Sequence, residues 1–127
     1  MLGGKIYVTN RSSLYCYDCN GEEQYVNHAA ANITAITTIN TDSSLSVQPD
    51  EIVIATDAAT MMRYNKLNIV FDYGKIIGNA TALCWVGKGV MVGTEEGAIG
   101  YYEAKKYKWK AKSVHSVLTI LKFQYVS

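Results

Sequence analysis

A repeat of about 40 residues organises this sequence and restricts its possible folds more than any other feature. Three short β-type runs begin at Ile6, Ile52 and Val90, and after each comes a second run that ends in an aromatic and a polar residue. A third series of small and branched residues advances with them: Thr34-Ala35-Ile36, Thr81-Ala82-Leu83 and His115-Ser116-Val117. Because the three series recur at nearly the same spacings along the chain, the sequence indicates an internal repeat.

Each repeat contains four candidate β-strands separated by turn residues. The strands are expected at Ile33–Ile39, Glu51–Thr56, Thr60–Asn65 and Leu67–Tyr73 in the middle repeat, and at Thr81–Val86, Gly89–Thr94, Ala98–Glu103 and Lys106–Lys112 in the next. No stretch sustains apolar residues at helical spacing, so helix content should be very low. Four-stranded units at this period are typical of β-propeller blades, because a lone four-stranded sheet leaves both of its faces unburied.

The chain supplies about three blades, whereas most propellers have about 4–8. We expect blades at approximately 1–31, 32–78 and 79–113, with 114–127 starting the next. The chain begins with the second strand of a blade and ends on the first strand of another, Ser116–Phe123. Either it is a segment of a longer propeller, which we favour, or several chains close one ring and the last strand of each completes the first blade of the next.

Composition excludes several functional classes. The 127 residues are 49% hydrophobic and 18% charged, with 12 Lys plus Arg against 11 Asp plus Glu. A net charge of +1 gives no general attraction to nucleic acid, and any membrane contact is expected to be indirect. No apolar run approaches the roughly 20 residues of a membrane span, and the first residues do not form a secretory signal. Three cysteines, Cys16, Cys19 and Cys84, are expected to be reduced in the cytoplasm.

Motifs for catalysis or metal binding are weak. Cys16-Tyr17-Asp18-Cys19 is a lone Cys-x-x-Cys that ends a predicted strand, and the remaining zinc-type ligands are scattered. Neither His28 nor His115 has a nearby serine or carboxylate in a recognisable arrangement. We therefore predict no catalytic residue, no metal, no cofactor and no enzyme activity. A quinone-dependent dehydrogenase propeller would need a cofactor pocket and a periplasmic leader, and neither is visible.

Three segments of the last repeat carry a family resemblance: Thr81-Ala82-Leu83-Cys84, Gly97-Ala98-Ile99-Gly100-Tyr101-Tyr102-Glu103 and Tyr107-Lys108-Trp109-Lys110-Ala111-Lys112-Ser113. They resemble the middle of the N-terminal propeller of the Bardet–Biedl syndrome 2 protein family, whose members are BBSome subunits. The resemblance covers roughly residues 13–120. In such propellers a carboxylate-rich loop often precedes the strand at Asp50, but here residues 40–49 contain only Asp42, so no calcium site is transferred.

The resemblance implies a protein-interaction scaffold in ciliary membrane-protein trafficking. Its partners would be other BBSome subunits, such as the Bardet–Biedl syndrome 7 protein. The implied locations are the cytoplasm, the cilium, the ciliary membrane and the basal body. The alternative is a small propeller that forms a homo-oligomeric ring and binds a ligand, such as a sugar, between blades.

Aromatic and basic residues of the last repeat are the candidate contact residues: Tyr101, Tyr102, Tyr107, Trp109, Lys106, Lys108 and Lys110. Aromatic residues are enriched at interface centres, and the lysine side could meet an acidic protein surface or a lipid headgroup. Two other interpretations stay open. The aromatic side chains could instead fill the space between blades, and the lysines could belong to a solvated edge strand.

Overall fold

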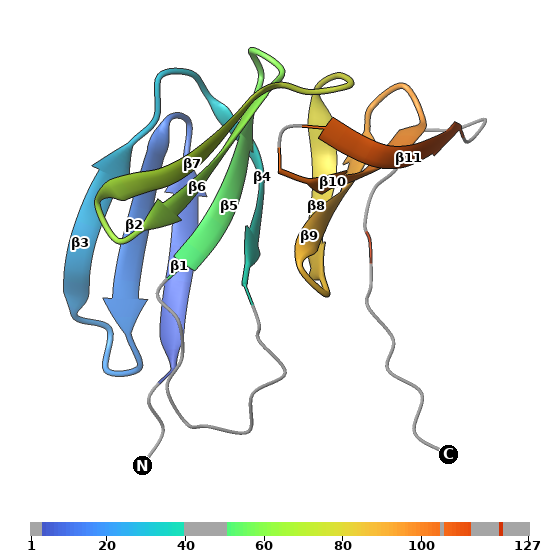
Figure 1. Ribbon diagram of the computed structural model, residues 1–127. Helices are drawn as coiled ribbons and strands as arrows, with labels where there is room; N and C mark the ends of the chain where they lie inside the picture. Colours follow the sequence, from blue (N-terminus) through green and yellow to red (C-terminus); the bar gives the residue numbers. More distant parts are fainter. Residues whose placement is uncertain (1–3, 40–50, 105, 113–119, 121–127) are drawn as a thin grey trace.

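The computed structural model describes residues 4–39, 51–104, 106–112 and 120, and the side chains of Lys106 and Tyr107 are outside the description. Eleven strands in these residues form three antiparallel sheets (Figure 1). The first sheet has the order β1-β2-β3 and contains β1 (Lys5–Asn10), β2 (Ser13–Asp18) and β3 (Glu23–His28). The middle sheet has the order β4-β5-β6-β7 and contains β4 (Ile33–Thr38), β5 (Glu51–Thr56), β6 (Thr60–Asn65) and β7 (Asn68–Lys75). The third sheet has the order β8-β9-β10-β11 and contains β8 (Ala80–Val86), β9 (Gly89–Thr94), β10 (Ala98–Glu103) and β11 (Lys106–Lys112).

The architecture confirms the predicted fold class, an all-β propeller segment with no helix in the described residues. The largest difference from the expected strands is at β7, which begins one residue later and ends two residues later than predicted. Lys66 has a φ of 56°, so Lys66 and Leu67 form a tight turn. Gly74 has a φ of 73° beside a register shift, which lets the strand continue to Lys75. The predicted strand Ser116–Phe123 lies outside the described residues except for Ile120.

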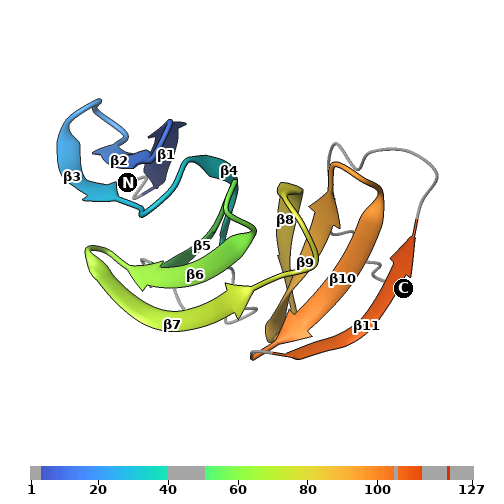
Figure 2. The same cartoon turned by 90° about the horizontal axis from the view of Figure 1, so that it is seen from above.

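The three sheets lie side by side like the blades of a propeller, as the view from above shows (Figure 2). Strands β4 and β5 pack against β8, so the first strands of the middle and third sheets meet on the inner side. Strands β7 and β11 lie on the outer side, and the chain crosses from β7 to β8 to begin the next sheet. Small residues such as Ala35 and Ala80 allow the inner strands to approach closely.

The sequence repeat is also visible in local hydrogen bonds. The Asn32 carbonyl accepts a bond from the Asp57 amide at 2.8 Å, and the Asn79 carbonyl accepts the equivalent bond from the Glu95 amide at 3.2 Å. Each bond joins the start of a sheet to the turn after its second strand. Asn32 and Asn79 therefore occupy equivalent turns of the two sheets.

Strand β5 of the middle sheet is buried on both faces, which explains its hydrophobic run. Ile52 and Ile54 pack with Leu14 of the first sheet. Val53 and Ala55 point to the opposite side, because successive side chains of a strand alternate. There they join a cluster with six residues of the third sheet: Ala80, Leu83, Trp85, Val90, Val92 and Tyr102. Each sheet therefore shields its neighbour from water.

Candidate interaction surfaces

The open face of the third sheet carries a row of four side chains, one from each strand. Strand register places Cys84, Met91, Tyr101 and Trp109 side by side on this face. The rings of Tyr101 and Trp109 stack at 6.3 Å between centroids, and Trp109 is 46% exposed. The neighbouring Tyr102 is buried toward the middle sheet, so this row points away from it. The structure thus brings together two of the predicted contact residues.

Tyr101 is held firmly in this row. Its hydroxyl donates a hydrogen bond to the Val86 carbonyl at 2.8 Å. Its ring covers Gly89, where an added Cβ would overlap both this ring and the Tyr102 carbonyl oxygen. Burial, followed by the nearby Glu103 carboxylate, raises the pKa of Tyr101. The aromatic row is therefore a rigid surface, because its central ring has little freedom to move.

Tyr102 lies in the interior and does not fit the predicted contact role. Its side chain is 2% exposed and packs between the middle and third sheets. Its hydroxyl accepts a hydrogen bond from the Ile77 amide at 3.0 Å, which ties β10 to the crossing segment before β8. Two adjacent tyrosines in one strand point to opposite faces, so only one of them reaches the open face. We leave Tyr102 out of the contact set.

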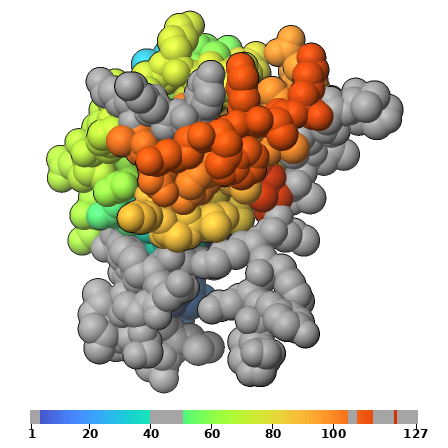
Figure 3. All heavy atoms as spheres, turned by 45° about the vertical axis from the view of Figure 1, so that its right-hand side comes forward, coloured from blue at the N-terminus to red at the C-terminus, as the bar shows by residue number. Residues whose placement is uncertain are grey.

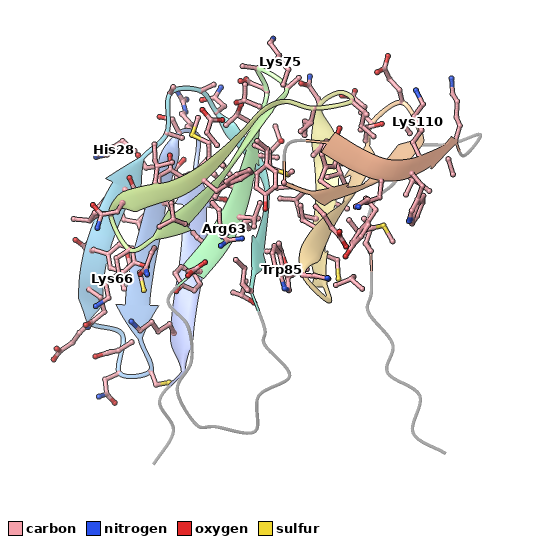
Figure 4. All side chains as sticks on the ribbon, viewed as in Figure 1. His28, Arg63, Lys66, Lys75, Trp85 and Lys110 are labelled. Atoms are coloured by element: carbon pink, nitrogen blue, oxygen red, sulfur yellow. The ribbon has the colours of Figure 1, made fainter. Side chains whose placement is uncertain are left out.

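The lysines of β11 lie along the outer edge of the third sheet, where β11 (orange) crosses the surface in Figure 3. Lys108 and Lys110 are exposed, and Lys110 is labelled in Figure 4. The Lys108 ammonium lies 3.6 Å from a Glu103 carboxylate oxygen, a surface pair that contributes little to stability. The predicted side-chain roles of Lys106 and Tyr107 fall outside the described residues.

Two apolar surfaces were not found from the sequence. On the open face of the first sheet, Ile6 is 50% and Val8 is 46% exposed. On the outer side of the middle sheet, Leu67, Ile69 and Val70 are 57%, 55% and 44% exposed. We call these last three residues, together with the side of β7 that pairs with no strand of the described residues, the β7 edge. Strand β7 has no lysine before Lys75, whereas lysines alternate along β11. This difference between the two outer strands is the sequence signal that could have indicated the β7 edge.

A charged cluster joins the middle and third sheets. Arg63 Nε lies 3.0 Å from Glu51 Oε1, and the guanidinium lies 5.6 Å from the centroid of the Trp85 ring. Figure 4 labels both Arg63 and Trp85 in the region between these sheets. Burial raises the pKa of Tyr73, although Arg63 opposes this effect. The cation over the Trp85 ring is therefore a contact across the sheet interface.

Replacing Arg63 by methionine should lower the free energy of unfolding by about 1–2 kcal/mol, because methionine keeps the apolar stem but loses the cation–π contact and the Glu51 pair. Urea unfolding followed by circular dichroism measures this loss. The chain's other arginine, Arg11, is exposed, so Arg11→Met is the matched control and should change stability by less than about 0.5 kcal/mol. Equal losses in the two variants would contradict the inter-sheet role.

Other candidate chemistry is sparse in the described residues. Ser13 Oγ lies 3.1 Å from His28 Nδ1, an exposed cross-strand pair that the sequence did not reveal. Cys16, Cys19 and Cys84 are free thiols. Within the described residues, no three His, Cys, Asp or Glu side chains gather closely enough to hold a metal ion. The same residues include no helix that is long and apolar enough to cross a membrane. The predicted lack of enzyme activity stays a prediction.

No protein-family model and no curated protein sequence matches this chain. Among solved structures, it is similar to BBS1N, as seen in a crystal structure of BBS1N in complex with ARL6DN. The TM-score is 0.70 with 14% sequence identity. The similarity covers 85% of this chain and 36% of that chain, so this chain spans about a third of its neighbour. At this identity the similarity shows a shared fold, that of a BBSome subunit propeller, and does not single out the Bardet–Biedl syndrome 2 family.

Proposed function

We propose that this chain is part of a propeller scaffold that binds other proteins, and that a partner binds along the β7 edge. The observation that carries this proposal is the exposure of Leu67, Ile69 and Val70 on the outer strand of the middle sheet. The similar propeller BBS1N is in complex with another protein, ARL6DN, which supports protein binding by this fold.

The physical reason for choosing β7 is its unprotected edge. It is the last strand of the middle sheet, so one side of its backbone has no neighbouring strand among the described residues. Such an edge can pair with an extended segment of a partner, and the exposed Ile69 and Val70 side chains add apolar contact. On β11 the exposed Lys108, Lys110 and Lys112 discourage the same pairing by charge.

Tyr101 and Trp109 have a different proposed role. Their row lies on the face of the third sheet that points away from the middle sheet, and the middle sheet is buried on both of its faces. We infer that another sheet of the same propeller packs against this row. The aromatic contacts predicted from the sequence would then join blades, while Lys108 and Lys110 border the joint.

The finer form of the proposal follows the sequence resemblance. It places the chain in a propeller of the Bardet–Biedl syndrome 2 type, with the Bardet–Biedl syndrome 7 protein as partner, acting in ciliary trafficking in the cytoplasm and at the cilium. Under this proposal the chain is not an enzyme. The alternative is a ring of identical chains, which the apolar open faces at Ile6, Val8 and Trp109 favour. Native mass spectrometry separates the two, because a ring requires a defined oligomer.

The test is biolayer interferometry with the full chain immobilised and purified Bardet–Biedl syndrome 7 protein or ARL6 in solution. We expect Ile69→Lys to weaken binding at least tenfold, because it places a charge in an apolar contact at the β7 edge. Asn10→Lys adds the same charge to an exposed site on β1 and should bind normally. Binding that Ile69→Lys leaves unchanged would refute the β7 edge, and no binding of either protein would refute the BBSome assignment.

A further inference from the structure

A hollow of about 380 Å³ lies between the first and middle sheets, beside the start of β7. Its lining comes from β1, β3, the β6–β7 turn and the first residue of β7: Lys5, Gln24, Tyr25, Lys66, Leu67 and Asn68. In Figure 4, Lys66 is labelled where this turn of the middle sheet reaches the first sheet. Leu67 belongs both to the hollow and to the β7 edge, so the two form one continuous surface.

The two walls of the hollow are tied together. The Asn27 side-chain amide of β3 donates a hydrogen bond to the Lys66 carbonyl at 3.0 Å, which joins the last strand of the first sheet to the β6–β7 turn. The φ of 56° at Lys66 sets this tight turn. The hollow is therefore formed before a ligand binds, and a preformed pocket loses little conformational freedom on binding.

Most polar side chains of the lining already have partners within the chain. The Gln24 amide donates hydrogen bonds to Asp18 Oδ2 at 3.2 Å and to the Glu22 carbonyl at 3.3 Å. Lys5 and Lys66 each take part in an interaction within the chain as well. A charged ligand would have to compete with these contacts, so the hollow is better suited to an apolar group.

An apolar surface continues from Leu67 along β7. Ile69 is paired with Tyr64 of β6, and directly paired residues lie on the same face of a sheet. Tyr64 packs with Leu14 of the first sheet, so this face looks toward the first sheet. Leu67 is 57% and Ile69 is 55% exposed. The hollow and the Ile69 side chain therefore lie on the same side of the middle sheet.

An extended segment paired with β7 would place every second side chain on this side, with about 7 Å between them. One of these side chains would pack over Ile69, and the next would reach the hollow beside Leu67. When a partner adds a strand to a sheet edge, main-chain hydrogen bonds give affinity and pockets for alternate side chains give specificity. The hollow has the position of such a pocket.

We propose that the hollow is the specificity pocket of the β7 edge and takes a large apolar side chain, such as leucine or phenylalanine, from an extended segment of the partner. This inference rests on the proposed function, because it uses the same edge. A volume of about 380 Å³ accommodates a side chain of this size. A lysine or arginine at the same position of the segment is disfavoured, because Lys5 and Lys66 line the hollow.

Fluorescence polarisation with short labelled peptides and the full chain tests this pocket. Each peptide is rich in threonine, which favours an extended conformation, and carries one variable residue at two alternate positions. The variable residue is phenylalanine, leucine, serine or lysine. We expect the phenylalanine and leucine peptides to bind saturably and about tenfold more tightly than the serine and lysine peptides, because only they bury a large apolar side chain.

Two variants at Gln24 separate the hollow from the edge. Gln24→Trp fills the hollow with a large side chain and should weaken binding of the phenylalanine peptide about tenfold. Gln24→Ala is the matched control, because it loses the same hydrogen bonds to Asp18 and the Glu22 carbonyl but leaves the hollow open. It should bind as the unmodified chain does. Thermal melts check that both variants are folded, and the selectivity of the unmodified chain among the peptides does not depend on either variant.

The outcomes distinguish the pocket from the edge. Equal binding of the phenylalanine and serine peptides, lost in Ile69→Lys, would overturn the pocket and leave the β7 edge in place. Equal affinities of Gln24→Trp and Gln24→Ala for the phenylalanine peptide would place the apolar contact outside the hollow. If no peptide binds, the pocket is wrong, whereas the proposed function is decided separately by the purified partner proteins.

Discussion

Trp85→Ala should lower the free energy of unfolding by about 3–5 kcal/mol, which for a chain of this size lowers Tm by roughly 10–20 °C. The side chain is 8% exposed and fills the interface between the middle and third sheets. Its removal leaves a cavity beside Val90 and Tyr102 and takes away the ring under Arg63. Among single substitutions in this chain, we expect this one to have the largest effect.

The second tryptophan provides the control for this prediction. Trp109 is 46% exposed on the outer strand of the third sheet, so Trp109→Ala should cost less than about 1 kcal/mol. Urea unfolding monitored by circular dichroism compares the two variants without depending on tryptophan fluorescence. Equal losses would show that the interface between the sheets is not where most of the stability lies, and would contradict the described packing.

The strands and their order were predictable from the sequence because the repeat fixes their phase. The bounds Glu51–Thr56, Thr60–Asn65 and Gly89–Thr94 agree with the structure, since turn residues mark both ends of each strand. The end of β7 was not predictable, because Gly74 occurs at a register shift that only pairing with β6 reveals. Local sequence sets the elements, while irregular pairing depends on the neighbouring strand.

The candidate sites were much less predictable. Tyr101 and Tyr102 are adjacent and chemically identical, and only the packing of β10 against β9 and the middle sheet shows which of them faces outward. Asn27 and Lys66 are far apart in sequence, and the Asn27 side chain reaches the Lys66 carbonyl only because the β6–β7 turn lies beside the first sheet. A contact between sheets leaves no local motif, so it appears only when the sheets are assembled.

Leu14→Ala should lower the free energy of unfolding by about 2–5 kcal/mol and should loosen the first sheet more than the third. Leu14 is 1% exposed and packs with Ile52, Ile54 and Tyr64 of the middle sheet. The first sheet has three strands where the others have four, so it depends strongly on this cluster. Amide hydrogen exchange should show lost protection in β1–β3 and little change in β8–β11.

Leu67→Ala is the matched control, since Leu67 is 57% exposed and its loss should cost less than about 0.5 kcal/mol. If Leu14→Ala instead raised exchange equally in all three sheets, the sheets would unfold as one unit and the separate attachment of the first sheet would be wrong.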